Sequence, residues 1–295
     1  MPKKVLIVGA TGYLGKQLVY AAKRAGHEVR ALARDPSRLP ADVDEVVVAE
    51  ATKPDSLAGI CDGVDVVISA LGITRQRDGL TYEAVDYAAN MNVLNEALKA
   101  RVQRFAYVHV LNADRMLHVP MVKAKARFAE ELRQAPIAST IINPSGFYSD
   151  LGEVLKMAQS GRVYLFGNGN TRVSPISGRD MAEVCISAID DRVDTIDVGG
   201  PETLTFHEVA QLAFKALSQP EKITHLPLGL GKLAVRIAKL LGFGKTVGAF
   251  EFFVAASGID MDAPNFGEQT LERHFATMLE PGVRDHKRNE LLASS

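Results

Sequence analysis

Short segments made almost entirely of hydrophobic residues alternate with longer amphipathic segments over about the first two thirds of the chain. Such short apolar runs are typical of strands buried on both faces of a parallel sheet, and we predict strands at residues 5–8, 28–33, 45–49, 65–70, 104–110, 139–143 and 195–198. Between them, apolar residues recur at helical spacing, and we predict helices at residues 13–25, 82–100, 121–134 and 179–189. This alternation predicts an α/β fold with a doubly wound parallel sheet, the Rossmann architecture.

The pattern changes after Pro144. Residues 161–171 are rich in glycine and asparagine and predict a hairpin or loop, and from Thr203 onward the pattern is mainly helical. We therefore predict two units. Residues 1–146 and 174–200 would form the NAD(P)-binding Rossmann domain, and residues 147–173 and 201–295 a smaller, mainly helical lobe for substrate or interaction.

Residues 232–243 in this lobe have apolar residues at helical spacing, interspersed with Lys232, Arg236 and Lys239. A basic amphipathic helix can lie on a membrane surface. More often such a helix forms the edge of a substrate lobe or a contact between two copies. The sequence therefore favours a lobe edge or a homodimer over a membrane.

Composition excludes several classes of function. The 295 residues include 34 Lys and Arg and 35 Asp and Glu, a net charge of -1, which argues against a nucleic-acid partner. The two cysteines, Cys61 and Cys185, cannot supply a structural zinc site, and we expect no metal. No apolar run is long enough to span a membrane, and the first residues lack a signal-peptide pattern. We expect a cytoplasmic protein.

The strongest motif is a glycine-rich turn, GATGYLG, between the first predicted strand and the first predicted helix. Its first glycine lets the chain turn tightly off the strand. The second lets a pyrophosphate approach the helix N-terminus, and the third lets the helix pack closely on the sheet. The predicted cofactor-binding residues of this turn are Gly9, Thr11, Gly12, Tyr13, Leu14 and Gly15.

Arg34 follows the second predicted strand, where the choice between NAD and NADP is made in this fold. An acidic residue at this point binds the ribose 2′-hydroxyl of NAD, whereas an arginine accommodates the 2′-phosphate of NADP. The planar guanidinium of Arg34 suits a phosphate, although Asp35 could still reach a ribose hydroxyl. The sequence favours NADP (NADPH) over NAD.

Beyond the glycine turn, five segments resemble the short-chain dehydrogenase/reductase superfamily. They are DVVISALG (65–72), RFAYVHV (104–110), INPSGF (142–147), PISGRDMAEV (175–184) and GGPE (199–202). The chain is most similar to the atypical NAD(P)-binding branch that includes NmrA-like and isoflavone-reductase-like proteins. The resemblance covers roughly residues 3–215 and implies dinucleotide binding, but no particular reaction.

The resemblance also indicates where catalytic groups would lie. The superfamily uses a strand serine followed by Tyr-x-x-x-Lys on the next helix, where the lysine binds the nicotinamide ribose and lowers the pKa of the tyrosine. Here Lys125 occupies the lysine position, Met121 the tyrosine position and His109 the serine position. A thioether can neither give nor take a proton, so Met121 cannot perform the usual step.

Two interpretations remain. In the first, Lys125 or His109 is the general acid of an NADPH-dependent oxidoreductase that acts on a small carbonyl or activated alkene. In the second, the protein binds NADP without catalysis, as a redox sensor or scaffold of the NmrA-like type. The partner is thus a small-molecule substrate or none. His109 could instead be a half-buried structural residue.

Further candidate residues lie where strands end at the carboxyl edge of the predicted sheet, the edge at which ligands bind. Ala70, Leu71 and Gly72 would let the cofactor lie close to the backbone. By resemblance, the loop that starts at Pro144 flanks the nicotinamide. Phe147 and Tyr148 in this loop could stack on a planar substrate, or they could be packing residues.

Overall fold

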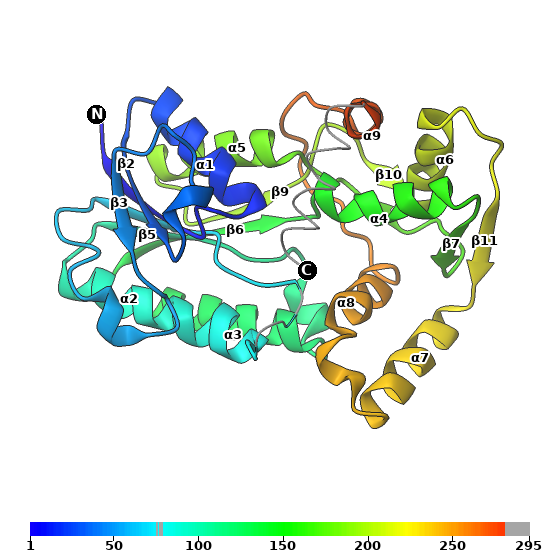
Figure 1. The fold of residues 1–295 in the computed structure, drawn as a ribbon, viewed down its shortest axis with the longest axis horizontal. Coiled ribbons are helices and arrows are strands. Elements are labelled where there is room, and N and C mark those ends of the chain that lie inside the picture. The colour runs from blue at the N-terminus through cyan, green and yellow to red at the C-terminus, as the bar shows by residue number, and fades with distance from the viewer. Residues whose placement is uncertain (75, 77–78, 281–295) are drawn as a thin grey trace.

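The computed structural model describes residues 1–74, 76 and 79–280, and its centre is a sheet of seven parallel strands (Figure 1). The strands run across the sheet in the order β3 (Glu45–Val48), β2 (Glu28–Ala33), β1 (Lys4–Val8), β4 (Val66–Ser69), β5 (Arg104–Val108), β6 (Ala138–Pro144) and β9 (Thr195–Val198). The order reverses between β1 and β4, as in a doubly wound Rossmann sheet. The predicted α/β fold is confirmed.

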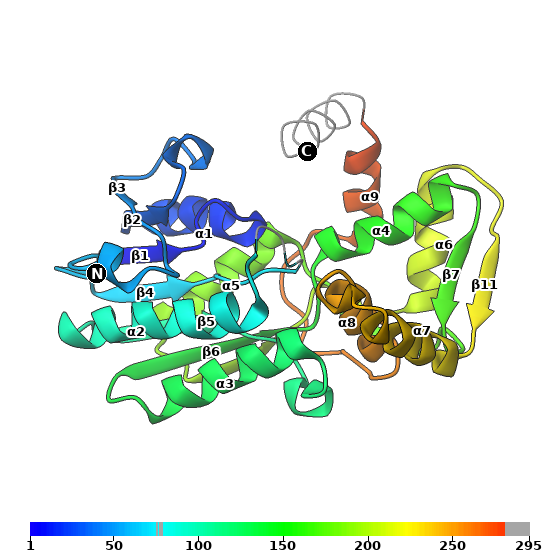
Figure 2. The same cartoon turned by 60° about the horizontal axis from the view of Figure 1, so that its bottom comes forward.

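Helices cover both faces of this sheet. Helices α1 (Tyr13–Arg24) and α5 (Gly178–Asp190) pack on one face, and α2 (Asn90–Lys99) and α3 (Pro120–Gln134) on the other (Figure 2). Successive residues of β1 point to opposite faces, so Val5 and Ile7 join one core and Leu6 and Val8 the other. This double burial explains why the strands are continuous apolar runs.

The helix predicted at residues 82–100 is divided into two parts. Its first part is a π-helical segment, η3 (Glu83–Ala89), and α2 begins at Asn90. The amide of Asn90 donates to the carbonyl of Asp86 at 3.0 Å and to that of Val85 at 3.3 Å. The Asn90 side chain therefore satisfies carbonyls of the π-helical segment, and the Asp86 side chain in the same segment is fully buried.

The second part of the molecule is mainly helical, with α4 (Tyr148–Gln159), α6 (Phe206–Ala216), α7 (Leu228–Leu240), α8 (Gly248–Ala256) and α9 (Leu271–Leu279). Two small sheets join these helices: β7 (Val163–Phe166) pairs with β11 (Ile223–Leu226), and β8 (Arg172–Val173) pairs with β10 (Leu204–Thr205). Residues 161–171, predicted as a hairpin or loop, do not form a hairpin, because β7 lies parallel to a strand about 60 residues further along the chain. Residues 167–171, after β7, do form a loop. In the figures this lobe lies beyond the carboxyl edge of the main sheet (Figures 1 and 2).

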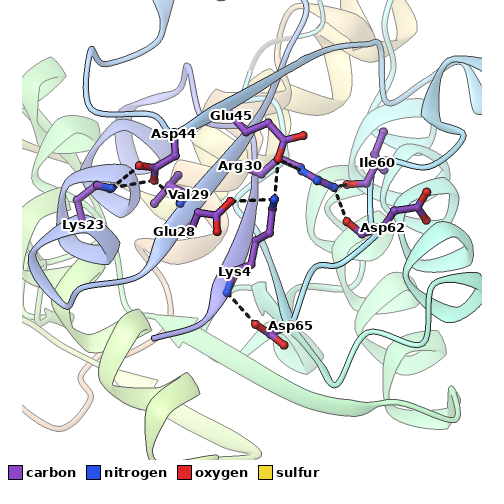
Figure 3. A network of polar contacts seen from close by, with 10 residues as sticks. All are labelled: Lys4, Lys23, Glu28, Val29, Arg30, Asp44, Glu45, Ile60, Asp62 and Asp65. Atoms are coloured by element: carbon purple, nitrogen blue, oxygen red, sulfur yellow. Dashed lines mark hydrogen bonds and ion pairs between the residues drawn. The ribbon is translucent and has the colours of Figure 1, made fainter. Parts of the chain in front are cut away.

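Charged side chains join the opposite, amino ends of the first strands (Figure 3). Lys4 at the start of β1 contacts Glu28 at the start of β2 and Glu45 at the start of β3, each at 2.8 Å. Arg30 also reaches Glu45 at 2.8 Å and donates to the carbonyls of Ile60 and Asp62. This edge is therefore closed by ion pairs, and the carboxyl edge is left for a ligand.

Candidate cofactor and active site

At Gly9 and Gly15, the glycine turn between β1 and α1 leaves no room for a Cβ. Gly9 has a φ of +84°, and a Cβ there would lie 3.0 Å from the carbonyl oxygen of Ala70. A Cβ on Gly15 would lie only 2.0 Å from the carbonyl oxygen of Gly9. Gly12 is the N-cap of α1, and no side chain of the described residues caps this helix end. The first backbone N–H groups of α1 can therefore bind an anion, and the turn fits a pyrophosphate.

Tyr13 and Leu14 follow in the same turn and are held differently. The Tyr13 hydroxyl accepts a hydrogen bond from the Gly178 N–H at the start of α5, and the Tyr13 ring contacts Phe147 edge-on at 6.1 Å. Because 45% of Tyr13 is exposed, it can also contact a ligand. The Leu14 side chain is buried beneath the sheet, so Leu14 can offer only its backbone N–H.

Thr11, Arg34, Asp35 and Arg38 line a shallow hollow of about 240 Å³ next to the glycine turn. The Asp35 carboxylate is the N-cap of the short helix η1 (Pro36–Arg38) and accepts hydrogen bonds from the Ser37 N–H and hydroxyl. These bonds lower the pKa of Asp35 and occupy one of its oxygens. Two arginines thus face the hollow beside an engaged carboxylate, which suits a phosphate better than a ribose hydroxyl.

The predicted residues at the end of β4 meet a buried ion pair. The Lys125 ammonium on α3 lies 3.3 Å from the Asp86 carboxylate on η3. A Cβ on Gly72 would lie 2.6 Å from Asp86 Oδ1 and 2.8 Å from Lys125 Nζ, so a larger residue there would displace the charged ends of this pair. The other Asp86 oxygen accepts a hydrogen bond from the Ile73 N–H at 3.3 Å. Backbone and charge pair therefore form one unit at the carboxyl edge of the sheet.

Burial and charge act in opposite directions on this pair. Burial alone would lower the pKa of Lys125, but Tyr107 and Asp86 outweigh it, and the pKa of Lys125 is raised. Burial raises the pKa of Asp86, although the Lys125 charge opposes the rise. The Lys125 side chain is 14% exposed, and the rest of it is buried. Lys125 is therefore a protonated group that faces the predicted cofactor edge.

The ring of Tyr107 on β5 connects Lys125 with His109. Lys125 Nζ lies 5.4 Å from the centre of the Tyr107 ring, and the His109 ring stacks on the same ring at 5.9 Å. Burial and the nearby Lys125 charge lower the pKa of His109 to about 3. His109 is thus neutral at physiological pH, and of the two predicted acids Lys125 is the charged one. Among the described residues, the buried His109 Nδ1 has no hydrogen-bond partner.

Of the remaining predicted residues, some lie at the carboxyl edge of the main sheet and others in the core of the lobe. Pro144 ends β6, and its carbonyl accepts a hydrogen bond from the Leu111 N–H at 3.1 Å. Met121 lies one helical turn before Lys125, but its side chain belongs to the buried core of the lobe. Tyr148 cannot stack on a substrate as expected, because it is fully buried and its hydroxyl donates to the carbonyl of Gln269. The packing interpretation holds for Tyr148, whereas Phe147 is partly exposed.

Three further residues, Asp86, Tyr107 and Arg38, lie at the site in the structure. From the sequence, Asp86 and Asn90 lie on a predicted helix near the sheet, where both are expected to be structural and to bond neighbouring backbone. Asn90 is, but Asp86 also holds Lys125. From the sequence, Tyr107 could supply a phenol only if the alignment of the helix that carries Lys125 is wrong, and the structure places its ring beside Lys125 and His109. Arg38 follows Arg34 by about one turn in the sequence, and the structure shows that it shares the hollow with Arg34.

A family model described as NAD(P)H-binding matches residues 9–192, more than half of the chain. The chain belongs to this NAD(P)H-binding family. The match begins at Gly9, the first residue of the glycine turn, and ends beyond α5. It therefore includes the turn, Arg34, the Gly72 segment and Lys125, the residues that the geometry brings to one edge of the sheet.

Two groups of relatives cover nearly the whole chain. The divinyl chlorophyllide a 8-vinyl-reductase of Zea mays is 27% identical over 97% of this chain and 82% of the relative. The photosystem II assembly factor Ycf39 of Trieres chinensis is 26% identical over 91% of this chain and 85% of the relative. One relative is thus named as a reductase and the other as an assembly factor, so similarity to members of the family does not fix a single activity.

Solved structures of reductases have the same fold. The NADPH-dependent quinone oxidoreductase QOR2 of Escherichia coli, solved with NADPH, has a TM-score of 0.74 and 17% identity, and covers 94% of this chain and 100% of its own. An isoflavone reductase has a TM-score of 0.72 and 16% identity over 95% of this chain and 100% of its own. The likeness extends through the lobe, because almost the whole of both chains is aligned.

Proposed function

We propose that the protein is an NADPH-dependent reductase of a small carbonyl or activated alkene, and that Lys125 both holds the nicotinamide ribose and provides the proton. The observation that carries this proposal is the buried pair of Lys125 and Asp86 against Gly72, because it keeps a protonated group at the carboxyl edge of the sheet. The names of an alkene-reducing relative and a quinone-reducing structural neighbour agree with this class of reaction.

Each residue of the site has a separate role in cofactor binding or proton transfer. The free N–H groups at the start of α1 bind the pyrophosphate, and Arg34 with Arg38 binds the 2′-phosphate. NADPH, when bound, supplies the hydride. Asp86 keeps the proton on Lys125 Nζ, and Lys125 releases it to the substrate atom that gains negative charge. Because its raised pKa makes Lys125 a weak acid, transfer requires a strongly basic oxygen or carbon. Solvent then returns the proton to the exposed side of Lys125.

The first test is titration calorimetry of the purified protein with NADPH, NADP⁺, NADH and NAD⁺. We expect tight binding of the phosphorylated pair. The second test measures NADPH oxidation with a panel of enones, vinyl-substituted aromatics and quinones, using the parent, Lys125→Arg and Lys125→Ala. We expect turnover to fall strongly in Lys125→Ala and to be partly kept in Lys125→Arg, which retains the charge. Full turnover in Lys125→Ala would remove Lys125 from the mechanism.

A second candidate function is nucleotide-dependent sensing or scaffolding without catalysis. The buried thioether of Met121 at the tyrosine position favours it, as does the name of the assembly-factor relative. A sensor must bind NADP⁺ and NADPH with different affinities, since a ligand pair with equal affinity shifts no equilibrium. Unequal affinities without turnover on the whole panel would favour this function over reduction.

A further inference from the structure

Helix α7 carries a row of large hydrophobic side chains on its solvent side. Leu240 is 80% exposed and Leu241 67%, and Phe243 in the short helix η5 (Phe243–Lys245) that follows is 59% exposed. The earlier members of the row lie three or four residues apart and so share one face of the helix. We call this row the α7 apolar face, and its members are Leu230, Leu233, Ile237, Leu240, Leu241 and Phe243.

This exposure is concentrated in one part of the chain. Within the described residues, fourteen large hydrophobic side chains are exposed, and seven of them lie between Leu230 and Phe250. The opposite side of α7 is already packed, because Gly231 lies against Phe166 of β7 and Val254 of α8, and Val235 is buried. The α7 apolar face is therefore a second apolar surface, additional to the one that holds the helix on the lobe.

The segment that carries this face has charges of one sign. From Lys222 to Phe250 the sequence contains five Lys and Arg residues and no Asp or Glu, although the whole chain has a net charge of -1. Lys239 pairs with Glu251 of α8 at 2.6 Å. Lys232 and Arg236 are exposed and make no ion pair with any residue that the structure describes. At 100° per residue, these two lie together on one flank of the α7 apolar face.

We propose that α7 is an interfacial helix that docks the protein on an anionic lipid surface. The α7 apolar face would enter the boundary between headgroups and acyl chains, and Lys232 and Arg236 would lie at the lipid phosphates. Among the described residues no helix is long and apolar enough to cross a bilayer, so α7 would lie in the plane of the surface. In both views it lies at the outer rim of the lobe, where a flat surface can reach it (Figures 1 and 2).

The charge pattern favours lipid over a second copy of the chain. A two-fold contact would bring the same face of each copy together, so two patches of the same positive charge would approach each other without an acidic partner from residues 222–250. On an anionic surface, each of Lys232 and Arg236 should instead raise the affinity of the protein for the surface by roughly fivefold. Apolar insertion and charge complementarity therefore point to the same occupant.

The test is flotation of the purified full chain with two kinds of vesicle, phosphatidylcholine alone and phosphatidylcholine mixed with phosphatidylglycerol. We expect binding to the anionic vesicles, at least about tenfold weaker binding to the neutral ones, and a decrease with added salt. Two double variants, Leu233→Ser/Leu240→Ser and Lys232→Gln/Arg236→Gln, should each weaken binding at least about tenfold.

A matched double variant, Leu117→Ser/Lys123→Gln, removes an exposed leucine and an exposed lysine elsewhere and should bind as the parent does. Circular dichroism and thermal melting verify that every variant folds. The proposal is overturned if the parent does not float with anionic vesicles, or if it floats equally with both kinds. It is also overturned if Leu233→Ser/Leu240→Ser only abolishes concentration-dependent self-association, which would assign the face to a second copy.

Discussion

Lys125 and Asp86 face each other at 3.3 Å directly beside the backbone of Gly72, with the Asp86 side chain fully removed from solvent. An ion pair of this kind adds little net stability, because both charges lose their hydration. Removal of one partner is nevertheless costly, since the other charge then stays buried alone. The pair is thus better explained by what it keeps in place at the cofactor edge than by the stability it provides.

Asp86→Asn should separate these two effects. Without the carboxylate, the pKa of Lys125 should fall, since Asp86 is one of the groups that raise it. The loss of turnover at high pH should then begin at a lower pH than in the parent. Stability in urea should fall by about 2 kcal/mol, a figure reduced for the partial exposure of Lys125. The exposed Asp114→Asn is the control, and an unmoved alkaline limb would show that Asp86 does not act on Lys125.

The low pKa of His109 should make the stability of the protein depend on pH. Its pKa of about 3 in the folded protein lies below the ordinary 6.5, so the unfolded chain takes up the proton first. Stability should be fully present above about pH 6.5 and should fall as the pH decreases toward 3. When the pH falls from about 7.5 to 5, this one group should lower the free energy of unfolding by about 2 kcal/mol. Urea titrations at both pH values should show this loss in the parent and about 2 kcal/mol less of it in His109→Gln. Equal losses in the two proteins would show that the folded ring does not resist protonation.

Gly15→Ala should damage both folding and nucleotide binding. The new methyl group would lie 2.0 Å from the Gly9 carbonyl, so either α1 or the turn must move. We expect a loss of about 2 kcal/mol or more in stability, with a large decrease in NADPH affinity by calorimetry. Gly229→Ala, which has no atom within 4 Å of its Cβ, is the matched control. It should be neutral or slightly stabilising, because alanine favours the helix.

Arg34→Gln should change the choice of cofactor. Loss of a charge-assisted contact to a phosphate costs about 1.5–3 kcal/mol, which corresponds to roughly 10-fold to 100-fold in affinity. The affinity for NADPH should fall by this factor, and that for NADH should stay nearly unchanged. Calorimetry with both nucleotides provides its own control. Equal losses of affinity for NADPH and NADH would mean that Arg34 supports the fold of the hollow and does not bind the 2′-phosphate.

Glu45→Gln tests the closed end of the sheet. Lys4 and Arg30 hold the pKa of Glu45 below its usual 4.5, so its contribution is present above about pH 4.5 and is lost as the pH falls further. Because Glu45 is partly exposed, the variant should be less stable by on the order of 1 kcal/mol at neutral pH. The difference should vanish in acid, and nucleotide affinity should not change at either pH.

The sequence predicts features whose causes are local. Strands β2 and β9 have their predicted bounds, and the glycine turn is recognisable because its three glycines each meet a backbone constraint within the turn. Features that depend on distant partners were missed. β7 is a strand through its pairing with β11, and Asp86 is the partner of Lys125 because η3 packs against α3. Tyr148 was open to two interpretations until the lobe core enclosed it.

The two edges of the parallel sheet have consequences for engineering. The ion pairs of Lys4, Arg30 and their partners lie where strands begin, whereas the loops that follow β4 and β6 lie where strands end. Substitutions at the partly exposed Phe147 would therefore sample new specificities without touching the ion pairs at the other edge. Tyr148 must be kept in such a library, because it is buried in the lobe core and its replacement would change stability together with specificity.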